Sequence, residues 1–196
     1  MSQSRFRNIS QRPLRLVGVD EGVFSVRRGR IGRTVLVAVL LEGPQITDIR
    51  VGTIEVDGVD AQQVLLTLLN PLSYDAVMLS GISFGGFNLI DIKRLARRTG
   101  KPVIAVIRER PNSKAVRDAL RKHFDDWRLR WKFVEHAGLL YSCKPVAEEP
   151  SLYFEVAGAS PGFAIGAIAS SSLISRLPEP VRVAGILAKG LPVFSA

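Results

Sequence analysis

The stretch Leu14-Arg-Leu-Val-Gly-Val-Asp-Glu-Gly-Val-Phe24 decides the fold that this chain is expected to adopt. Leucine and valine follow one another with few polar interruptions, which is typical of a strand covered on both faces. Asp20 and Glu21 come where the apolar run ends, and Gly22 lets the backbone turn away. We therefore predict a central strand with two acids at its end, a position that collects ligands and metals in open α/β sheets. An Asp-Glu-Gly turn without function is the alternative.

The composition indicates a globular chain with a sizeable core. It has 196 residues, of which 46% are hydrophobic and 23% are charged. The single Cys143 excludes an internal disulfide, and with only His123 and His136 it leaves no Cys/His set for zinc. The N-terminus has no apolar signal segment, and no stretch reaches the roughly 18 apolar residues that span a bilayer. We expect a cytoplasmic protein with no membrane partner.

The net charge of +9 is concentrated in two segments. Residues 1–33 carry eight arginines against two acids, and residues 93–132 carry fourteen lysines and arginines against four acids. Clustered cations can mark a nucleic-acid footprint, because each phosphate that they neutralise releases counterions. A solvated cationic surface explains the same count, and the charge pattern alone leaves both interpretations open.

The order of the predicted elements indicates the fold class. Residues 1–13 form a basic arm, and residues 14–196 a single domain. Strands are predicted at 14–20, 34–41 and 46–56 as an antiparallel meander, then at 74–79, 103–107, 139–145 and 152–156. Helices are predicted after Asp60, after Asn88 with Asp91 completing a capping box, from Ser113, and at 161–173 and 179–189. Residues 125–137 fit a helix or a strand, and we favour the helix.

Meander, helix, strand, helix, strand, helix is the order of an α/β ribonuclease H-like fold. Its mixed sheet combines a three-stranded antiparallel meander with parallel strands, is flanked by helices, and makes the first and fourth strands parallel neighbours. Asp20 and Ser80 would then face each other across neighbouring strand ends. Glycines are expected to wall this cleft: Gly22, Gly81, Gly85 and Gly86.

Five segments together resemble an uncharacterised, mostly archaeal protein family related to endonuclease V. They are Gly18-Val-Asp-Glu-Gly22, Val56-Asp-Gly-Val-Asp60, Ser80-Gly-Ile-Ser-Phe-Gly-Gly-Phe-Asn-Leu-Ile-Asp91, Pro102-Val-Ile-Ala-Val-Ile-Arg108 and Pro178-Glu-Pro-Val-Arg-Val-Ala184. Endonuclease V itself is similar in the element order, the strand-borne Asp and the glycine-rich segment after the fourth strand. The resemblance implies a magnesium-dependent nuclease that acts beside deaminated purines.

The residues of the family pattern carry over unevenly. Asp20 matches the first metal-binding carboxylate of endonuclease V, and Arg108 matches a basic residue after the fifth strand. Ser80 departs from the pattern, because family members usually read Asp-Gly where this chain reads Ser-Gly. The first helix supplies no further acid, and Glu21 helps only if the strand has ended, since strand neighbours point to opposite faces. Mg²⁺ takes one or two carboxylates besides substrate phosphates, so losing one predicts a weak, degenerate metal site.

Two of the functions compatible with these residues are an enzyme and a scaffold. As an endonuclease, the protein would use Asp20 as metal ligand and Glu21 or Asp91 as a second acid. A metal-bound water would be the nucleophile, and Arg108 the phosphate clamp. As a scaffold, it would form homo-oligomers through its Ala/Gly-rich C-terminal helices.

We favour a third function, binding of nucleic acid, either DNA or RNA, or of a nucleotide, without efficient chemistry. Phe84 and Phe87 would stack on a base, although aromatic residues beside a glycine turn also pack against a core. The side chains expected to hold phosphates are Arg27, Arg28, Arg30, Arg97, Arg98, Lys101 and Arg108.

Overall fold

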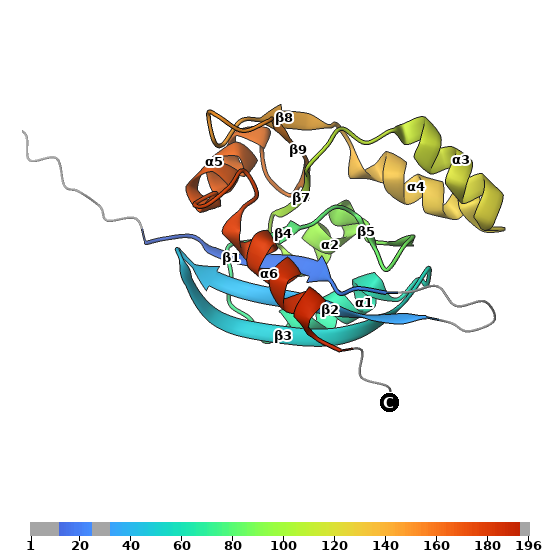
Figure 1. Cartoon of the computed structure of the whole chain (residues 1–196), viewed down its shortest axis with the longest axis horizontal. Coiled ribbons are helices and arrows are strands. Elements are labelled where there is room, and N and C mark those ends of the chain that lie inside the picture. Colours follow the sequence, from blue (N-terminus) through green and yellow to red (C-terminus); the bar gives the residue numbers. More distant parts are fainter. Residues whose placement is uncertain (1–11, 25–31, 193–196) are drawn as a thin grey trace, which may run out of the picture.

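A seven-stranded mixed sheet forms the centre of the protein (Figure 1). The computed structural model describes residues 12–24 and 32–192. In their order across the sheet, the strands are β3 (Gln45–Glu55), β2 (Arg33–Glu42), β1 (Arg15–Glu21), β4 (Ala76–Leu79), β7 (Val103–Ile107), β9 (Leu152–Ala157) and β8 (Tyr141–Cys143).

β1 lies inside the sheet, as its apolar sequence predicts. It pairs antiparallel with β2 and parallel with β4, where Leu16 lies opposite Ala76 and Val19 opposite Leu79. β4 in turn pairs parallel with β7. The meander thus lies on one side of β1 and the parallel strands on the other, which confirms the ribonuclease H-like mixed sheet. The carboxyl ends of β1, β4 and β7 therefore meet at one end of the sheet.

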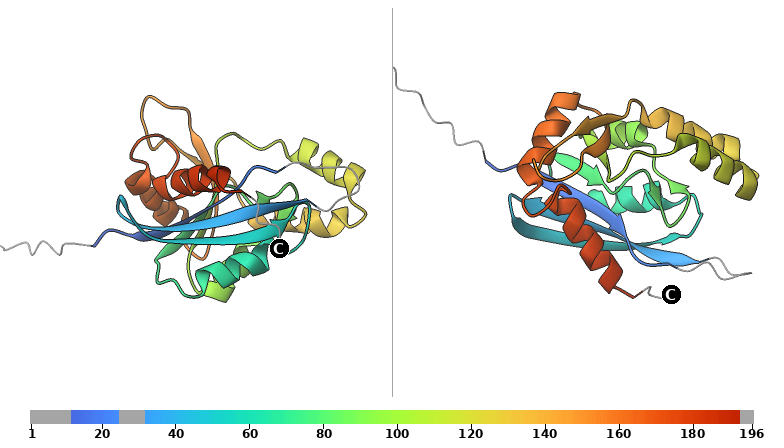
Figure 2. Two further views of the ribbon diagram at one scale, coloured as in Figure 1. Left: turned by 60° about the horizontal axis from the view of Figure 1, so that its bottom comes forward. Right: turned by 45° about the horizontal axis from the view of Figure 1, so that its top comes forward.

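Helices cover both faces of the sheet (Figure 2). They are α1 (Ala61–Leu69), α2 (Ile92–Thr99), α3 (Ser113–His123), α4 (Trp127–Ala137), α5 (Pro161–Ser171) and α6 (Glu179–Gly190). α1 and α2 pack on the face to which Val17 and Val19 point, and α5 and α6 cover the other. Four alanines are buried against this chain's own sheet, Ala164 and Ala167 of α5 and Ala184 and Ala188 of α6, whereas Ala169 of α5 is exposed.

α3 and α4 form a helical hairpin beyond the carboxyl ends of the parallel strands (Figure 1). The helix favoured for residues 125–137 is therefore confirmed. Arg130 of α4 is 8% exposed and donates to the backbone carbonyls of Gly58 and Phe87 at 3.1 and 2.6 Å. Its guanidinium also pairs with Asp126 at 2.8 Å. Arg130 thus ties the hairpin to the loop before α1 and to the glycine-rich segment after β4.

The prediction that Asn88 caps α2 is wrong. α2 begins after Asp91, whose carboxylate accepts a backbone N–H of the first turn at 2.9 Å. Asn88 lies in β6 (Asn88–Leu89), which pairs with β5 (Ser83–Phe84) in a small hairpin. Its buried side chain accepts the N–H of Ala61 at 3.0 Å and so caps α1 instead.

Some predictions concern segments that the structure covers only in part. Of the arm at residues 1–13, Arg12 and Pro13 are described, and Arg12 pairs with Asp75 at 2.8 Å.

None of the helices within residues 12–24 and 32–192 combines the length and the hydropathy that a bilayer crossing requires.

Candidate functional site

Asp20 and Ser80 meet where β1 and β4 end. The hydroxyl of Ser80 donates a hydrogen bond of 2.6 Å to Asp20 Oδ1, and the Ser80 N–H donates to the Val19 carbonyl at 3.0 Å. Asp20 Oδ1 also accepts the backbone N–H of Glu21 at 2.9 Å. The parallel pairing of the two strands thus brings together the two residues that the sequence predicts to face each other.

A polar cavity of about 300 Å³, here called the Asp20 cavity, opens over this pair. Two cations line it, Arg108 from the end of β7 and Lys189 from α6. Apolar side chains complete the wall: Val106, Leu177 and Val181. A hydroxyl and two cationic side chains suit an anionic group such as phosphate.

The close approach of α6 to β1 brings Lys189 to the wall of the Asp20 cavity. A Cβ added at Gly18 would overlap the backbone of Pro180, and one added at Gly185 would overlap the Asp20 carboxylate. Glycine at these two positions therefore permits the contact between helix and strand. Sequence reasoning missed Lys189, because no local pattern shows that α6 returns to cover β1.

Glu21 occupies the last position of β1 and points to the opposite face from Asp20. Burial, followed by the charge of Asp20, raises the pKa of Glu21 to about 7. A hydrogen bond from the Gly85 backbone and the charge of Lys189 oppose that rise. Glu21 therefore exchanges its proton near neutral pH, and it is not among the residues that line the Asp20 cavity.

The residues around Asp20 do not fit a magnesium site. Within the described ranges, no three His, Cys, Asp or Glu side chains cluster so as to hold a metal ion. Ser80 adds no negative charge, Glu21 points away, and Arg108 and Lys189 bring positive charge to the cavity. Because Mg²⁺ is held by carboxylate and phosphate oxygens, this set favours an anion over a divalent cation.

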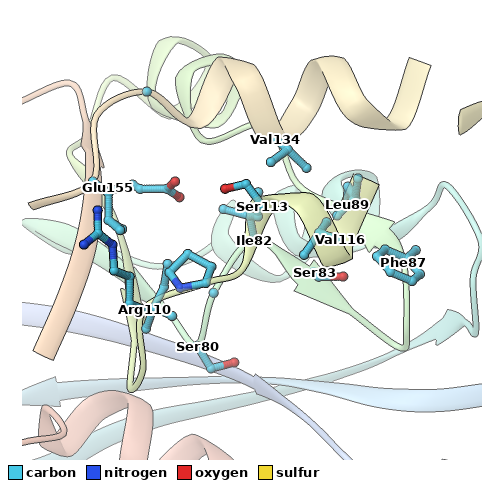
Figure 3. Close-up of a pocket in the computed structure, with 15 residues that line it drawn as sticks. Ser80, Ile82, Ser83, Phe87, Leu89, Arg110, Ser113, Val116, Val134 and Glu155 are labelled. Atoms are coloured by element: carbon cyan, nitrogen blue, oxygen red, sulfur yellow. The ribbon is translucent and has the colours of Figure 1, made fainter. Parts of the chain in front are cut away.

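A second cavity of about 530 Å³, here called the Glu155 cavity, also has Ser80 in its wall (Figure 3). Ser80 and Gly81 line it beside the Asp20 cavity, and Glu155 and Arg110 lie together at the end away from Phe87. Most of the remaining wall is apolar and comes from the β5 and β6 segment, β7, α3 and α4: Ile82, Leu89, Ile107, Val116 and Val134.

Glu155 is the most unusual residue of this second cavity. Its residue exposure is 9%, and no donor in the described part of the chain reaches its buried Oε2 atom. Burial raises the pKa of its carboxyl to about 7. Sequence reasoning missed Glu155, although a single acid within the apolar strand Leu152-Tyr-Phe-Glu-Val-Ala157 is a signal that could have found it.

The two predicted aromatic residues have different environments. Phe87 lines the Glu155 cavity and packs edge-on against Phe124, with 5.4 Å between ring centres. Phe84 is fully buried among the core side chains. The prediction that Phe84 stacks on a base is therefore wrong, because the β5 backbone turns this ring into the core.

Several other predicted site residues lie apart from both cavities. Gly85 and Gly86 form the turn between β5 and β6, with φ angles of 53° and 85°, and Gly22 packs beneath α6. Asp91 caps α2, and its carboxylate lies 3.5 Å from Nδ1 of His136. The structure does not bring Asp91 to Asp20.

The predicted phosphate-binding cations lie at opposite ends of β7. Arg108 follows this strand and lines the Asp20 cavity. Lys101 lies just before β7, about 20 Å from Arg108 at the strand's rise per residue. Arg97 and Arg98 of α2 lie beside Lys101. The remaining predicted cations fall outside the described residues: Arg27, Arg28 and Arg30.

Comparison with known proteins identifies the family. The sequence model of a family described as Endonuclease dU matches residues 12–192. The chain belongs to the Endonuclease dU family. A UPF0215 protein of Methanothermobacter thermautotrophicus is 35% identical over 196 residues, which cover 97% of this chain and 93% of the relative. A UPF0215 protein of Thermococcus gammatolerans is 36% identical over 183 residues, which cover 91% of this chain and 92% of that relative.

Solved structures share the fold of this Endonuclease dU family member. A protein of unknown function from Archaeoglobus fulgidus has a TM-score of 0.77 at 28% identity, covering 89% of this chain and 96% of that one. Endonuclease V from Streptomyces avermitilis has a TM-score of 0.59 at 15% identity, covering 90% and 83%. Endonuclease V from Ciona intestinalis was solved with an inosine-containing DNA. It has a TM-score of 0.56 at 14% identity, and the match covers 90% of this chain and 84% of that one. The resemblance to an archaeal family related to endonuclease V is thus confirmed.

Proposed function

We propose that this protein binds a nucleic-acid strand across the ends of β1 and β4, with a phosphate in the Asp20 cavity and a base in the Glu155 cavity. The observation that carries the proposal is the position of Ser80, which lines both cavities. A polar, cationic space and a larger, mostly apolar one are therefore adjacent. A nucleotide has the matching parts, an anionic phosphate and a base with apolar faces.

The charges around the smaller cavity support a phosphate as its occupant. Arg108 presents a planar guanidinium that can bind two phosphate oxygens, and Lys189 adds a compact positive charge. Asp20 opposes them with one negative charge, and the Ser80 hydroxyl already hydrogen-bonds that carboxylate. The two cations outnumber the single anion, and the net charge of +9 favours a polyanionic partner.

Family membership supports a nucleic acid as the partner. The structure of the Ciona intestinalis endonuclease V contains DNA, so DNA is the first partner to test and RNA the second. Metal-dependent cleavage is the second candidate function, favoured by the strand-end position of Asp20 and by the family description. With serine at position 80 and no second acid beside Asp20, we place binding first and give Mg²⁺ a weak role at most.

Fluorescence anisotropy with a labelled single-stranded oligonucleotide tests the proposed binding. We expect Arg108→Ala and Lys189→Ala each to weaken binding roughly tenfold, because each removes a charge-assisted contact to phosphate. Each lost contact should also reduce the slope of log K against log salt by about 0.7. Thermal unfolding of each variant checks that the fold is retained.

A matched control uses the cations at the other end of β7. The triple variant R97A/R98A/K101A removes three charges and should weaken binding less than Arg108→Ala does. If the triple variant abolishes binding while Arg108→Ala has no effect, the strand lies along α2 and the proposed site is wrong. Absence of binding to both DNA and RNA strands would also contradict it.

A further inference from the structure

The Glu155 carboxyl is left unexplained by the phosphate and apolar contacts of the proposed function. It extends from β9 into its cavity toward Ser113 (Figure 3). Within the described residues, no donor reaches Oε2, although a buried polar atom without a partner is destabilising. A ligand that supplies an N–H donor at this point would satisfy the atom.

Arg110 complements Glu155 at the same end of the cavity (Figure 3). They are the two charged residues among those that line this space. An ionised carboxylate only accepts hydrogen bonds, and a guanidinium only donates them. The cavity therefore has an acceptor and a donor at one end of a volume whose other walls are mostly apolar.

We propose that Glu155 determines base specificity by accepting the ring N–H of a nucleobase whose neighbouring carbonyl is bound by Arg110. Uracil, thymine, guanine and hypoxanthine have a ring N–H beside a carbonyl, whereas adenine and cytosine have an amino group beside a ring nitrogen. A ring N–H is more acidic than an amino N–H and makes the stronger hydrogen bond to a carboxylate. The inference rests on the proposed function for the location of the base, and it goes further by assigning the recognition of this base edge to Glu155 and Arg110.

Binding of three oligonucleotides that differ in one base tests this inference. The strand is all cytosine except for a central uracil, 3-methyluracil or cytosine, so that the phosphate contacts stay the same. At about pH 8 the wild-type protein should bind the uracil strand about tenfold more tightly than the 3-methyluracil strand, since hydrogen bonds to charged groups are the strong ones. The cytosine strand should resemble the 3-methyluracil strand.

Substitution of Glu155 assigns the preference to this carboxyl. Glu155→Met keeps the side-chain length but removes the acceptor, so the affinities for uracil and 3-methyluracil should become equal. Glu155→Gln retains one acceptor oxygen and should keep part of the preference. Thermal unfolding confirms that both variants are folded.

The results separate this inference from the proposed function. If all three strands bind wild type equally, or if Glu155→Met keeps the tenfold preference, the role of Glu155 is wrong while strand binding stands. If no strand binds, NMR titration with uridine and 3-methyluridine decides the matter. Shifts of Glu155-cavity signals with uridine alone would support the role of Glu155 and contradict strand binding, and no shift with either nucleoside would overturn both.

Discussion

The two cavities that share Ser80 differ in the properties that decide what they bind. The Asp20 cavity is small, polar and cationic, whereas the Glu155 cavity is larger, mostly apolar and holds a carboxyl with an unpaired oxygen. Both are nevertheless lined from β7, because Val106 lines the first and its neighbour Ile107 the second. The alternation of side chains at the strand ends therefore separates the two kinds of chemistry. Different helices then cover each face, α6 on one side and the α3–α4 hairpin on the other.

The largest expected effect is a loss of stability that disrupts the Asp20 cavity and leaves the Glu155 cavity unchanged. A Cβ at Gly18 would overlap the backbone of Pro180, so Gly18→Ala should displace α6 and lower the free energy of unfolding by roughly 3 kcal/mol. Lys189 would then leave Asp20, whereas no α6 residue lines the Glu155 cavity. Urea unfolding measures the loss, and the uracil preference should survive it.

Gly166→Ala in α5 is the matched control for that substitution. A Cβ there meets no atom within 4 Å, and alanine in a helix interior should stabilise it by up to about 1 kcal/mol. Equal destabilisation by the two alanine variants would show that the close contact between α6 and β1 is not the cause.

The next largest effect is a pH-dependent change in stability that comes from the Glu155 cavity alone. Because burial raises the folded-state pKa of Glu155 from 4.5 to about 7, the folded state holds this proton more tightly than the unfolded state does. The contribution of Glu155 to stability should therefore fall as pH rises through that interval, and the loss should be complete above it. The stability of Glu155→Met relative to wild type should rise by on the order of 2 kcal/mol between about pH 4 and about pH 8. Urea unfolding across pH measures this, and a difference independent of pH would contradict it.

A smaller effect is expected at the wall between the cavities. Ser80→Asp removes the hydroxyl donor to Asp20 and sets two carboxylates together, which should cost about 1 kcal/mol without metal. Mg²⁺ should then stabilise this variant much more than it stabilises wild type. Ser80→Asn is the uncharged control, and thermal unfolding with and without Mg²⁺ compares all three. A full Mg²⁺ response in wild type would contradict the poor fit of this site to magnesium, and no response in Ser80→Asp would leave Asp20 as a structural acid.

The smallest effect distinguishes the two carboxyls that titrate near neutrality. The charge of Asp20 helps to raise the pKa of Glu21, whereas burial alone raises that of Glu155. Asp20→Asn should therefore lower the pKa of Glu21 and leave that of Glu155 unchanged. NMR titration of the carboxyl carbons measures both in one sample. Equal changes in the two groups would indicate a rearrangement of the sheet rather than the loss of one charge.

The sheet could be predicted from sequence because each strand has a local apolar pattern and because the order of the strands and helices along the chain restricts their pairing. The apolar run through Val17 and Val19 marks a strand covered on both faces, and the order of elements leaves few ways to pair it. Strand alternation also predicted that Asp20 and Glu21 diverge. The error at Asn88 arose because Asn88 and Asp91 are both good helix caps, and tertiary contacts decided which helix each one serves.

The site could be predicted only in part, because its residues come from distant segments. Lys189 reaches the Asp20 cavity only after α6 packs on β1, and Glu155 becomes unusual only when α3 and α4 enclose its cavity. Charge clustering along the sequence also misled, since Arg97 and Arg108 lie at opposite ends of one strand. Proximity in sequence is a poor guide to proximity in space at the ends of strands.

The anchoring of α4 by Arg130 determines how a ligand meets the Glu155 cavity. The guanidinium binds backbone carbonyls that flank α1 and end the glycine-rich turn, so Val134 on the far wall is fixed when the chain folds. This wall therefore loses its conformational entropy when the chain folds and loses no more when a ligand binds. Ligand entry should accordingly proceed without a slow closing step, and differences in affinity between bases should appear mainly in their dissociation rates.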